Sequence, residues 1–370
     1  MEVFRPYGFD RTLFFTTLAL IAIGLIMVFS SSAILSNEKY NQPFHFMINQ
    51  LIAAGMGIAL IFFILPIRKP FYENAYFIYV LLIITFVLLA LCIIMPAFGK
   101  INRSVQFLSL RFQPAELAKI SLVLFFSFYI QQNKDRLNEI KTLLFPLGIL
   151  FLAIFMIIRQ PDYGTALLVF LICAVILFIG GVSLKYFLYT GILSIAIFTF
   201  YLFKASYRLD RIFAFLSPSK DSLGAGFQII QSKLAVGSGG LLGVSLGEST
   251  QKLFFLPCVH TDYIYAIVGE ELGLVGALII LIIFFIFLWR GLVISRRATN
   301  LFSQVAAAGI TLAIFSQALL NISVVLGLGP PTGFPLPFIS FGRSSLISTL
   351  FGIGILLHIS QRKSTSRRKK

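Results

Sequence analysis

Residues 206–274 read SYRLDRIFAFLSPSKDSLGAGFQIIQSKLAVGSGGLLGVSLGESTQKLFFLPCVHTDYIYAIVGEELGL. This is the longest interval without an apolar run of membrane-crossing length, in a chain that otherwise consists mostly of such runs. It carries five basic residues, five glycines between positions 237 and 247, and Asp262 where the polar loop turns into an apolar run. A basic, glycine-rich loop that ends in a carboxylate at a membrane surface suits chemistry on a lipid-borne anion.

The composition around this loop defines the class of protein. Of the 370 residues, 58% are hydrophobic and 12% are charged, whereas soluble domains are about 25% charged. We therefore expect a polytopic membrane protein. The formal net charge of +16 is explained by cytoplasmic loops that obey the positive-inside rule, so we expect no nucleic-acid partner.

A membrane-spanning helix needs about 20 apolar residues, and by that measure the chain is an all-α integral membrane protein with about ten spans. Only the sequence Arg159-Gln160-Pro161 separates the fifth span from the sixth, so these two helices should form a tight re-entry at the proline. The predicted spans are 12–34, 45–66, 74–96, 114–131, 142–159, 162–181, 184–203, 262–289, 301–328 and 335–360.

The distribution of basic residues predicts the orientation. An even number of spans places both termini in the cytoplasm, where the tail 361–370 forms a basic anchor. The large loop 204–261, between the seventh and eighth spans, then faces outward, and its basic residues indicate an anionic ligand or are incidental solvated charge. We treat 1–370 as a single membrane domain, and expect 97–113 to lie in the outer interface as a short amphipathic piece.

Ionisable residues inside the spans are functional candidates, because a charge in the membrane is costly. Glu116 and Lys119 are three residues apart on a helix and can pair, either as a structural ion pair or with a catalytic role. Asp162 follows Pro161 at a helix start, where it can cap free N–H groups or face a cavity.

Other candidates lie close to Asp262 in the sequence or near the outer helix ends. Glu270 and Glu271 lie roughly 12 Å deeper than Asp262 along a helix, too far to pair with it, so we expect them to bond to other helices. His260 lies beside Asp262, and Arg343 either snorkels or lines the same cavity. The three histidines match no metal motif.

Five motifs in order resemble the SEDS family, which includes FtsW, RodA and SpoVE, over nearly the whole chain. The form GVSLGESTQKLFFLP is more similar to FtsW and SpoVE than to RodA. The five motifs are QPAELAK at 113–119, QPDYGTA at 160–166, GFQIIQSKLAVGSGGLLGVSLG at 226–247, LPCVHTDYIYAIVGEELGLVG at 256–276 and TGFPLPFISFGRSS at 332–345.

The resemblance implies a peptidoglycan glycosyltransferase of the bacterial cytoplasmic membrane that polymerises lipid II. It also implies a class B penicillin-binding transpeptidase as partner, among other membrane proteins of the divisome or elongasome. The family's essential aspartate falls on Asp262, and its core ion pair is similar to Glu116 and Lys119. Arg103 falls on a family arginine, although Ser104 replaces the usual tryptophan.

Two further positions depart from the family pattern. Cys258 stands where glutamate is common, and Arg343 where glycine is common. Neither departure removes the aspartate.

The chemistry of such a reaction assigns roles to these residues. A sugar hydroxyl is a poor nucleophile, so Asp262 would act as general base. The leaving pyrophosphate needs positive charge from side chains or from a divalent cation such as Mg²⁺ or Mn²⁺, for which Asp262 is a candidate ligand; no other cofactor is implied. Backbone N–H groups of the glycine-rich segment can bind phosphate, or its glycines serve close packing. The candidate phosphate-binding cations are Lys233, Lys252, Arg208, Arg211 and Arg103.

Two other functions remain open from the sequence. A lipid II flippase would also use charged residues and a cavity for a lipid anion, but we find no clear repeated halves or broken midplane helices. A non-catalytic scaffold of the division or elongation complex would need neither Asp262 nor the basic loop.

Overall fold

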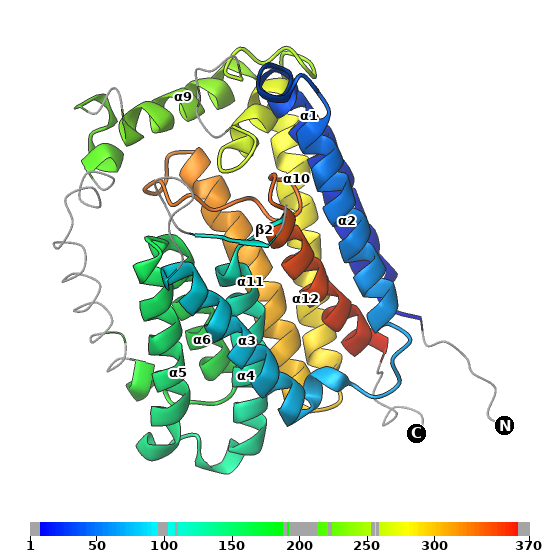
Figure 1. The fold of residues 1–370 in the computed structure, drawn as a ribbon, viewed down its shortest axis with the longest axis vertical. Helices are drawn as coiled ribbons and strands as arrows, with labels where there is room; N and C mark the ends of the chain where they lie inside the picture. Colours follow the sequence, from blue (N-terminus) through cyan, green and yellow to red (C-terminus); the bar gives the residue numbers. More distant parts are fainter. Residues whose placement is uncertain are drawn as a thin grey trace.

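The computed structural model describes residues 8–94, 103–107, 110–187, 191, 213–220, 224–252, 256 and 259–361. Figure 1 shows a bundle of long helices, with the start of α1 and the end of α12 at one end and α9 (Ala225–Ser238) across the other. We call these the terminal end and the loop end. The predicted spans agree with the observed helices α1 (Arg11–Tyr40), α2 (His45–Ile64), α3 (Ala75–Ile94), α4 (Pro114–Gln132), α5 (Ile140–Arg159), α6 (Tyr163–Ile179), α10 (Ile264–Arg297), α11 (Leu301–Val325) and α12 (Arg343–Gln361).

Seven of the described helices are long and apolar enough to cross a membrane, which identifies a multi-pass membrane protein. Of the other two helices that match predicted spans, α6 is apolar but shorter, and α4 carries Glu116 and Lys119. Most of the predicted seventh span, 184–203, lies outside the described residues, as do Arg208, Arg211 and the tail 362–370. The number of ten spans therefore stays a prediction.

The short connection between α5 and α6 has the expected form. Asp162 is the N-cap of α6, and its Oδ1 accepts a hydrogen bond from the backbone N–H of Thr165 at 3.2 Å. This bond satisfies one of the N–H groups that a helix start leaves without a partner. The predicted re-entry and the predicted cap are both confirmed.

Helices α4, α11 and α12 form the buried centre of the bundle, and α4 packs against α3, α6, α11 and α12. The outer helices keep large apolar side chains on their exposed faces, for example Phe15 on α1, Phe63 on α2 and Leu144 on α5. Hydrocarbon tails solvate such faces in a membrane, so only the inward faces need protein partners.

A β-hairpin lies at the loop end, within the region predicted as a short amphipathic piece. Strands β1 (Val105–Phe107) and β2 (Leu110–Phe112) pair antiparallel, with Val105 opposite Phe112. The alternation of residues in this region is therefore that of paired strands. The described residues form an otherwise helical bundle, in agreement with the predicted all-α class, and this small hairpin is an addition to it.

Helix α10 is broken at Gly273, which has φ 67° and ψ −168°. The glycine-rich loop fills the break: Leu274 N–H donates to the Gly240 carbonyl at 3.0 Å, and Val244 N–H donates to the Glu270 carbonyl at 3.0 Å. A Cβ on Gly243 would lie 2.1 Å from the Glu271 carbonyl oxygen. Gly243 and Gly273 thus serve close packing, and the sequence did not reveal this break.

The break lies near the membrane surface. From residue 274 to the end of α10 the helix runs for about 36 Å at 1.5 Å per residue, which exceeds the hydrocarbon core of about 30 Å. This part of α10 therefore crosses the membrane alone, and the turns from Ile264 to Gly273 form a separate cap at the loop end.

Gly273→Ala should strongly destabilise the protein. Its backbone conformation is almost exclusive to glycine, and such strain costs about 1–3 kcal/mol. In addition, an added Cβ would lie 2.4 Å from the backbone nitrogen of Gly243. The loss should be seen as a lower melting temperature of the detergent-purified protein. The control Gly237→Ala, in α9 with open space around an added Cβ, should have no adverse effect; equal melting temperatures for both variants would contradict this account.

Candidate active site

Two of the predicted site residues border Gly333 at the loop end of the bundle. A Cβ added to Gly333 would lie 3.4 Å from Asp262 Oδ2 and 3.6 Å from Arg103 Nη1. Asp262 precedes α10, Arg103 precedes β1, and Gly333 lies in the segment between α11 and α12. With φ +75°, Gly333 has a backbone conformation that suits glycine. An added Cβ would be in ordinary van der Waals contact with both groups, so the positive φ and not the space favours glycine here.

Asn321 on α11 holds the backbone around the carboxylate. Its Nδ2 donates to the carbonyl of Asp262 at 2.7 Å and to that of Phe334 at 2.6 Å, and the residue is 2% exposed. Ser340 Oγ donates to the Thr261 carbonyl, and Phe341 N–H donates to the His260 carbonyl at 2.9 Å. Thus α11 and the segment before α12 fix the residues that lead into α10.

Arg103 and Asp162 meet at the connection between α5 and α6. Arg103 Nη2 donates to the Pro161 carbonyl at 2.6 Å. Asp162 Oδ2 accepts from Gln113 Nε2 at 3.3 Å, while its Oδ1 caps α6. Asp162 is therefore a buried structural carboxylate, and it directly follows Pro161, whose carbonyl binds Arg103.

Several buried polar atoms near Gly333 have no hydrogen-bond partner among the described residues: Arg103 Nε, Asn321 Oδ1 and Thr332 Oγ1. Buried polar atoms in proteins are almost always paired with protein or water. Because Arg103 is beside Gly333 and Thr332 precedes it, these atoms indicate a place for water, an ion or a polar ligand at this site.

The predicted ion pair is present and fully buried. Lys119 Nζ lies 2.8 Å from Glu116 Oε2, and the two side chains are 7% and 3% exposed. Lys119 also donates to Gln317 Oε1, and Gln317 Nε2 donates to the Pro335 carbonyl at 2.9 Å. Ser345 Oγ donates to Glu116 Oε2 at 2.8 Å. The pair thus joins α4, α11 and α12 and supports the segment that carries Gly333.

Two of the predicted phosphate-binding cations have other contacts. Lys252 Nζ pairs with Glu271 Oε1 at 3.1 Å and donates to the Gly247 carbonyl. The Lys233 side chain packs against Gly327, close enough that an added Cβ there would clash with it. These contacts hold the loop on the bundle, and phosphate binding by either lysine stays a prediction.

The remaining predicted residues have mostly structural contacts. Glu270 accepts from Ser249 Oγ and from Thr250 N–H at 3.0 Å, so it bonds to the loop, where another helix was expected. Glu271 accepts from Ser30 Oγ of α1 at 2.7 and 2.6 Å, as expected. Arg343 Nη1 donates to Asn49 Oδ1 of α2 at 3.2 Å, and its place in the cavity stays a prediction.

Sequence reasoning missed the two amides of α11. Gln317 and Asn321 are four residues apart, so they lie on the same face of the helix. Both are buried and bond to the 332–336 segment. Two amides at this spacing within an apolar span would have been the signal.

His260 packs between aromatic rings beside the site. Its ring centroid lies 4.8 Å from that of Phe46 and 5.9 Å from that of Phe341. Burial, with a further contribution from the positive charge of Lys39, lowers the pKa of His260 from 6.5 to about 4. The imidazole is therefore neutral at pH 7.

Comparison with known families identifies the chain. Residues 11–365 match the family model FTSW_RODA_SPOVE, described as cell cycle protein. The chain belongs to the FtsW/RodA/SpoVE family. Stage V sporulation protein E of Bacillus subtilis is 39% identical over 357 residues, covering 95% of this chain and 97% of that protein. The probable peptidoglycan glycosyltransferase FtsW of Trichlorobacter lovleyi is 35% identical over 361 residues, covering 96% and 94%.

Solved structures of the FtsW/RodA/SpoVE type share the fold. A chain from the structure reported as "Structural coordination of polymerization and crosslinking by a peptidoglycan synthase complex" superposes with a TM-score of 0.78 at 26% identity, covering 96% of this chain and 99% of that one. RodA of Thermus thermophilus superposes with a TM-score of 0.70 at 23% identity, covering 96% and 98%.

Lys119→Met should destabilise this family member by about 3–5 kcal/mol, because it leaves the Glu116 carboxylate buried without its partner. The double variant Glu116→Gln/Lys119→Met removes both charges of the pair and should recover most of the lost free energy of unfolding. Denaturant unfolding in detergent measures both, with exposed Lys141→Met as the control. A double variant as unstable as the single one would contradict the ion-pair account.

Acid should weaken the packing of His260. Because its pKa is lowered in the folded state, the folded protein binds fewer protons than the unfolded chain between pH 6.5 and about 4. The stability contributed by the neutral ring is complete above pH 6.5 and is lost as the pH falls toward 4. The melting temperature of His260→Phe, which keeps an aromatic ring, should fall less than that of the wild type over this range. Parallel pH profiles would refute the expectation.

Proposed function

We propose that this protein is a peptidoglycan glycosyltransferase that polymerises lipid II at the outer face of the bacterial cytoplasmic membrane, with Asp262 as general base. The observation that carries the proposal is that the Asp262 carboxylate and the Arg103 guanidinium both border Gly333. The name of the FtsW relative from Trichlorobacter lovleyi supports the same reaction.

The proposed reaction joins two lipid-linked disaccharides. The 4-hydroxyl oxygen of a GlcNAc forms a bond to the anomeric carbon of a MurNAc, and the bond from that carbon to the pyrophosphate breaks. Asp262 takes the hydroxyl proton, and the electron pair leaves with the pyrophosphate. A good leaving group needs no general acid, so one carboxylate is enough for a direct displacement with inversion.

Positive charge beside the leaving pyrophosphate lowers the barrier. Arg103 is suited to this role, because its Nη2 is anchored on Pro161 and its Nε has no partner among the described residues. Lys233, Lys252, Arg208 and Arg211 remain further candidates.

A divalent cation such as Mg²⁺ or Mn²⁺ is compatible with this site. The described residues contain no group of three or more potential metal-ligating histidine, cysteine or acidic side chains. Mg²⁺, however, is commonly bound by one or two carboxylates together with substrate phosphates. Asp262 would hold such an ion together with the pyrophosphate, and the ion would neutralise charge on the leaving group.

The proposed orientation places both termini in the cytoplasm and the 204–261 loop outside. The start of α1 and the end of α12 lie on the same side of the bundle (Figure 1), in agreement with an even number of spans. We further propose a class B penicillin-binding transpeptidase as partner, with other membrane proteins of the divisome or elongasome. The structural neighbour from a peptidoglycan synthase complex supports such a partner.

A lipid II flippase is the second candidate, because the break in α10 is a feature that many transporters share. In transporters the broken helices lie near the midplane and line the substrate path. Here the break lies near the membrane surface, and the glycine loop pairs with its backbone groups. This arrangement favours a fixed site over alternating access. A non-catalytic scaffold, the other alternative, would not require a loop bonded in this way.

Asp262→Asn should retain the fold but lose polymerisation. The assay supplies lipid II to the purified protein with its cognate transpeptidase partner, blocks crosslinking, and separates glycan strands on a gel. The expected loss is at least about 100-fold, since positioned general bases contribute about 10²–10⁴-fold. Glu248→Gln, an exposed carboxylate of the same loop, is the matched control and should polymerise normally.

Two outcomes would overturn the assignment. Normal strands from Asp262→Asn would remove Asp262 as base. Lipid II transfer across vesicles by a folded wild type that makes no strands would establish the flippase. Loss of strands with EDTA and recovery with Mg²⁺ or Mn²⁺ would add the cation to the site.

A further inference from the structure

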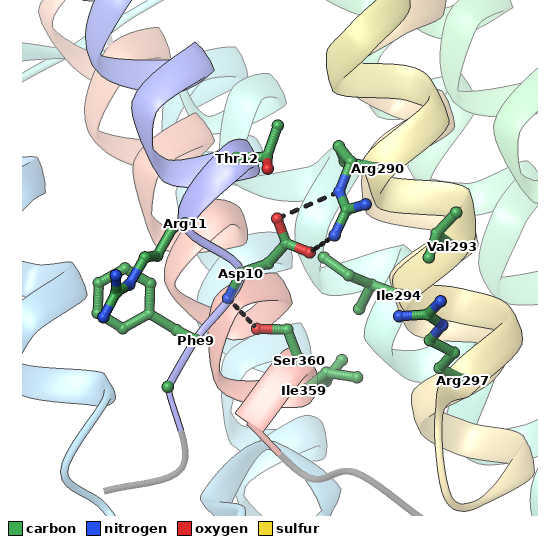
Figure 2. Close-up of a pocket in the computed structure, with 11 residues that line it drawn as sticks. Phe9, Asp10, Arg11, Thr12, Arg290, Val293, Ile294, Arg297, Ile359 and Ser360 are labelled. Atoms are coloured by element: carbon green, nitrogen blue, oxygen red, sulfur yellow. Dashed lines mark hydrogen bonds and ion pairs between the residues drawn. The ribbon is translucent and has the colours of Figure 1, made fainter.

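A pocket of about 210 Å³ opens at the terminal end of the bundle, which is opposite the loop end where the candidate active site lies. Figure 2 shows it between the start of α1, the last turns of α10 and the end of α12. Its polar lining consists of Asp10, Arg11, Thr12, Arg290, Arg297 and Ser360.

Asp10 holds the three helices together in this pocket. Its Oδ1 caps α1 by accepting from Leu13 N–H at 2.9 Å, and its backbone N–H donates to Ser360 Oγ of α12 at 3.0 Å. Arg290 of α10 donates to both carboxylate oxygens, through Nε at 3.3 Å and through Nη2. The wall of the pocket is thus built and ordered by the protein itself.

The pocket carries more positive charge than Asp10 can balance. Three arginines line it against this single carboxylate. A guanidinium has five N–H donors, and the bonds to Asp10 use only the Nε and one Nη2 donor of Arg290. Arg297 lies two turns further along α10, is exposed, and faces the same pocket (Figure 2). An acceptor with two or more oxygens suits these donors, and phosphate has the matching geometry.

The depth of the pocket indicates a lipid as the source of that phosphate. Trp289 is 61% exposed, and its ring lies 5.5 Å from the guanidinium carbon of Arg290. Exposed tryptophans of membrane proteins concentrate at the headgroup level. Arg290 also lies about 25 Å of helix below the break at Gly273, close to the opposite membrane surface.

The apolar part of the lining agrees with this source. Phe9, Val293, Ile294 and Ile359 border the same pocket. A free phosphate ion would have no use for apolar walls, whereas the glycerol and first acyl carbons of a phospholipid would bury apolar surface against them. Basic pockets between membrane helices are typical sites for anionic lipid headgroups.

We infer that this pocket binds the phosphate of an anionic phospholipid, in the inner leaflet under the orientation proposed above. The lipid phosphate accepts from Arg290 and Arg297 while Asp10 keeps its cap and its bond to α12. The bound lipid joins α1, α10 and α12 at the terminal end. At the loop end α1 bonds to α10 again through Ser30 and Glu271, so both ends of this helix pair are held.

The test compares two adjacent arginines. Full-length protein in a neutral detergent is titrated with phosphatidylglycerol, with phosphatidylcholine or with inorganic phosphate, and its melting temperature is followed. Phosphatidylglycerol should raise the melting temperature saturably, and the other two should not. Arg297→Gln should weaken the apparent affinity about five-fold. Arg296→Gln, equally exposed and one residue away but outside the pocket, should match the wild type.

A second variant tests the planar arrangement of the N–H donors of Arg290. Arg290→Lys keeps the charge but loses the planar arrangement of donors, so it should also weaken lipid binding. Asp262→Asn should bind phosphatidylglycerol like the wild type, which separates this inference from the proposed reaction. Equal effects of Arg296→Gln and Arg297→Gln would show that the lipid is held by non-specific attraction to basic residues and would overturn the pocket. Equal protection by inorganic phosphate would show a free-anion site and overturn the lipid.

Discussion

Backbone polar groups that are buried away from water must find partners within the protein, and the break in α10 is where this constraint shapes the molecule most. Gly273 is buried, so a second segment has to reach the backbone groups that the break frees. The glycine-rich loop does so, because Gly239 and Gly243 have no side chain and can approach the backbone of α10 closely. This loop is consequently anchored on α10.

The anchored loop determines the contacts of the charged residues near it. Glu270 and Glu271 lie in the first part of α10. Glu270 accepts hydrogen bonds from Ser249 and Thr250, and Glu271 pairs with Lys252. A buried carboxylate needs such donors, since an unpaired charge would cost several kcal/mol. Lys252, a candidate phosphate ligand from the sequence, neutralises Glu271 in the structure.

The other side of the candidate site rests on a second polar network. Glu116 and Lys119 of α4 meet Gln317 of α11, and Gln317 bonds to the segment that carries Gly333. One turn further, Asn321 bonds to both that segment and the backbone of Asp262. The backbone at Asp262 and the neighbouring segment that carries Gly333 are therefore both held by α11. At the opposite end, Asp10 joins α1, α10 and α12 beside the basic pocket.

The sequence by itself determined the features that depend on near neighbours along the chain. Apolar runs located the spans because membrane insertion responds to local hydrophobicity. The spacing of Glu116 and Lys119 predicted their pairing, and the position of Asp162 after Pro161 predicted the helix cap. Only the tertiary structure decided that α10 is broken at Gly273, that Lys252 pairs with Glu271, and that Arg103, Asn321 and Gly333 surround Asp262. These contacts join residues tens to hundreds of positions apart, and each depends on how whole helices pack, which periodicity and local spacing do not encode.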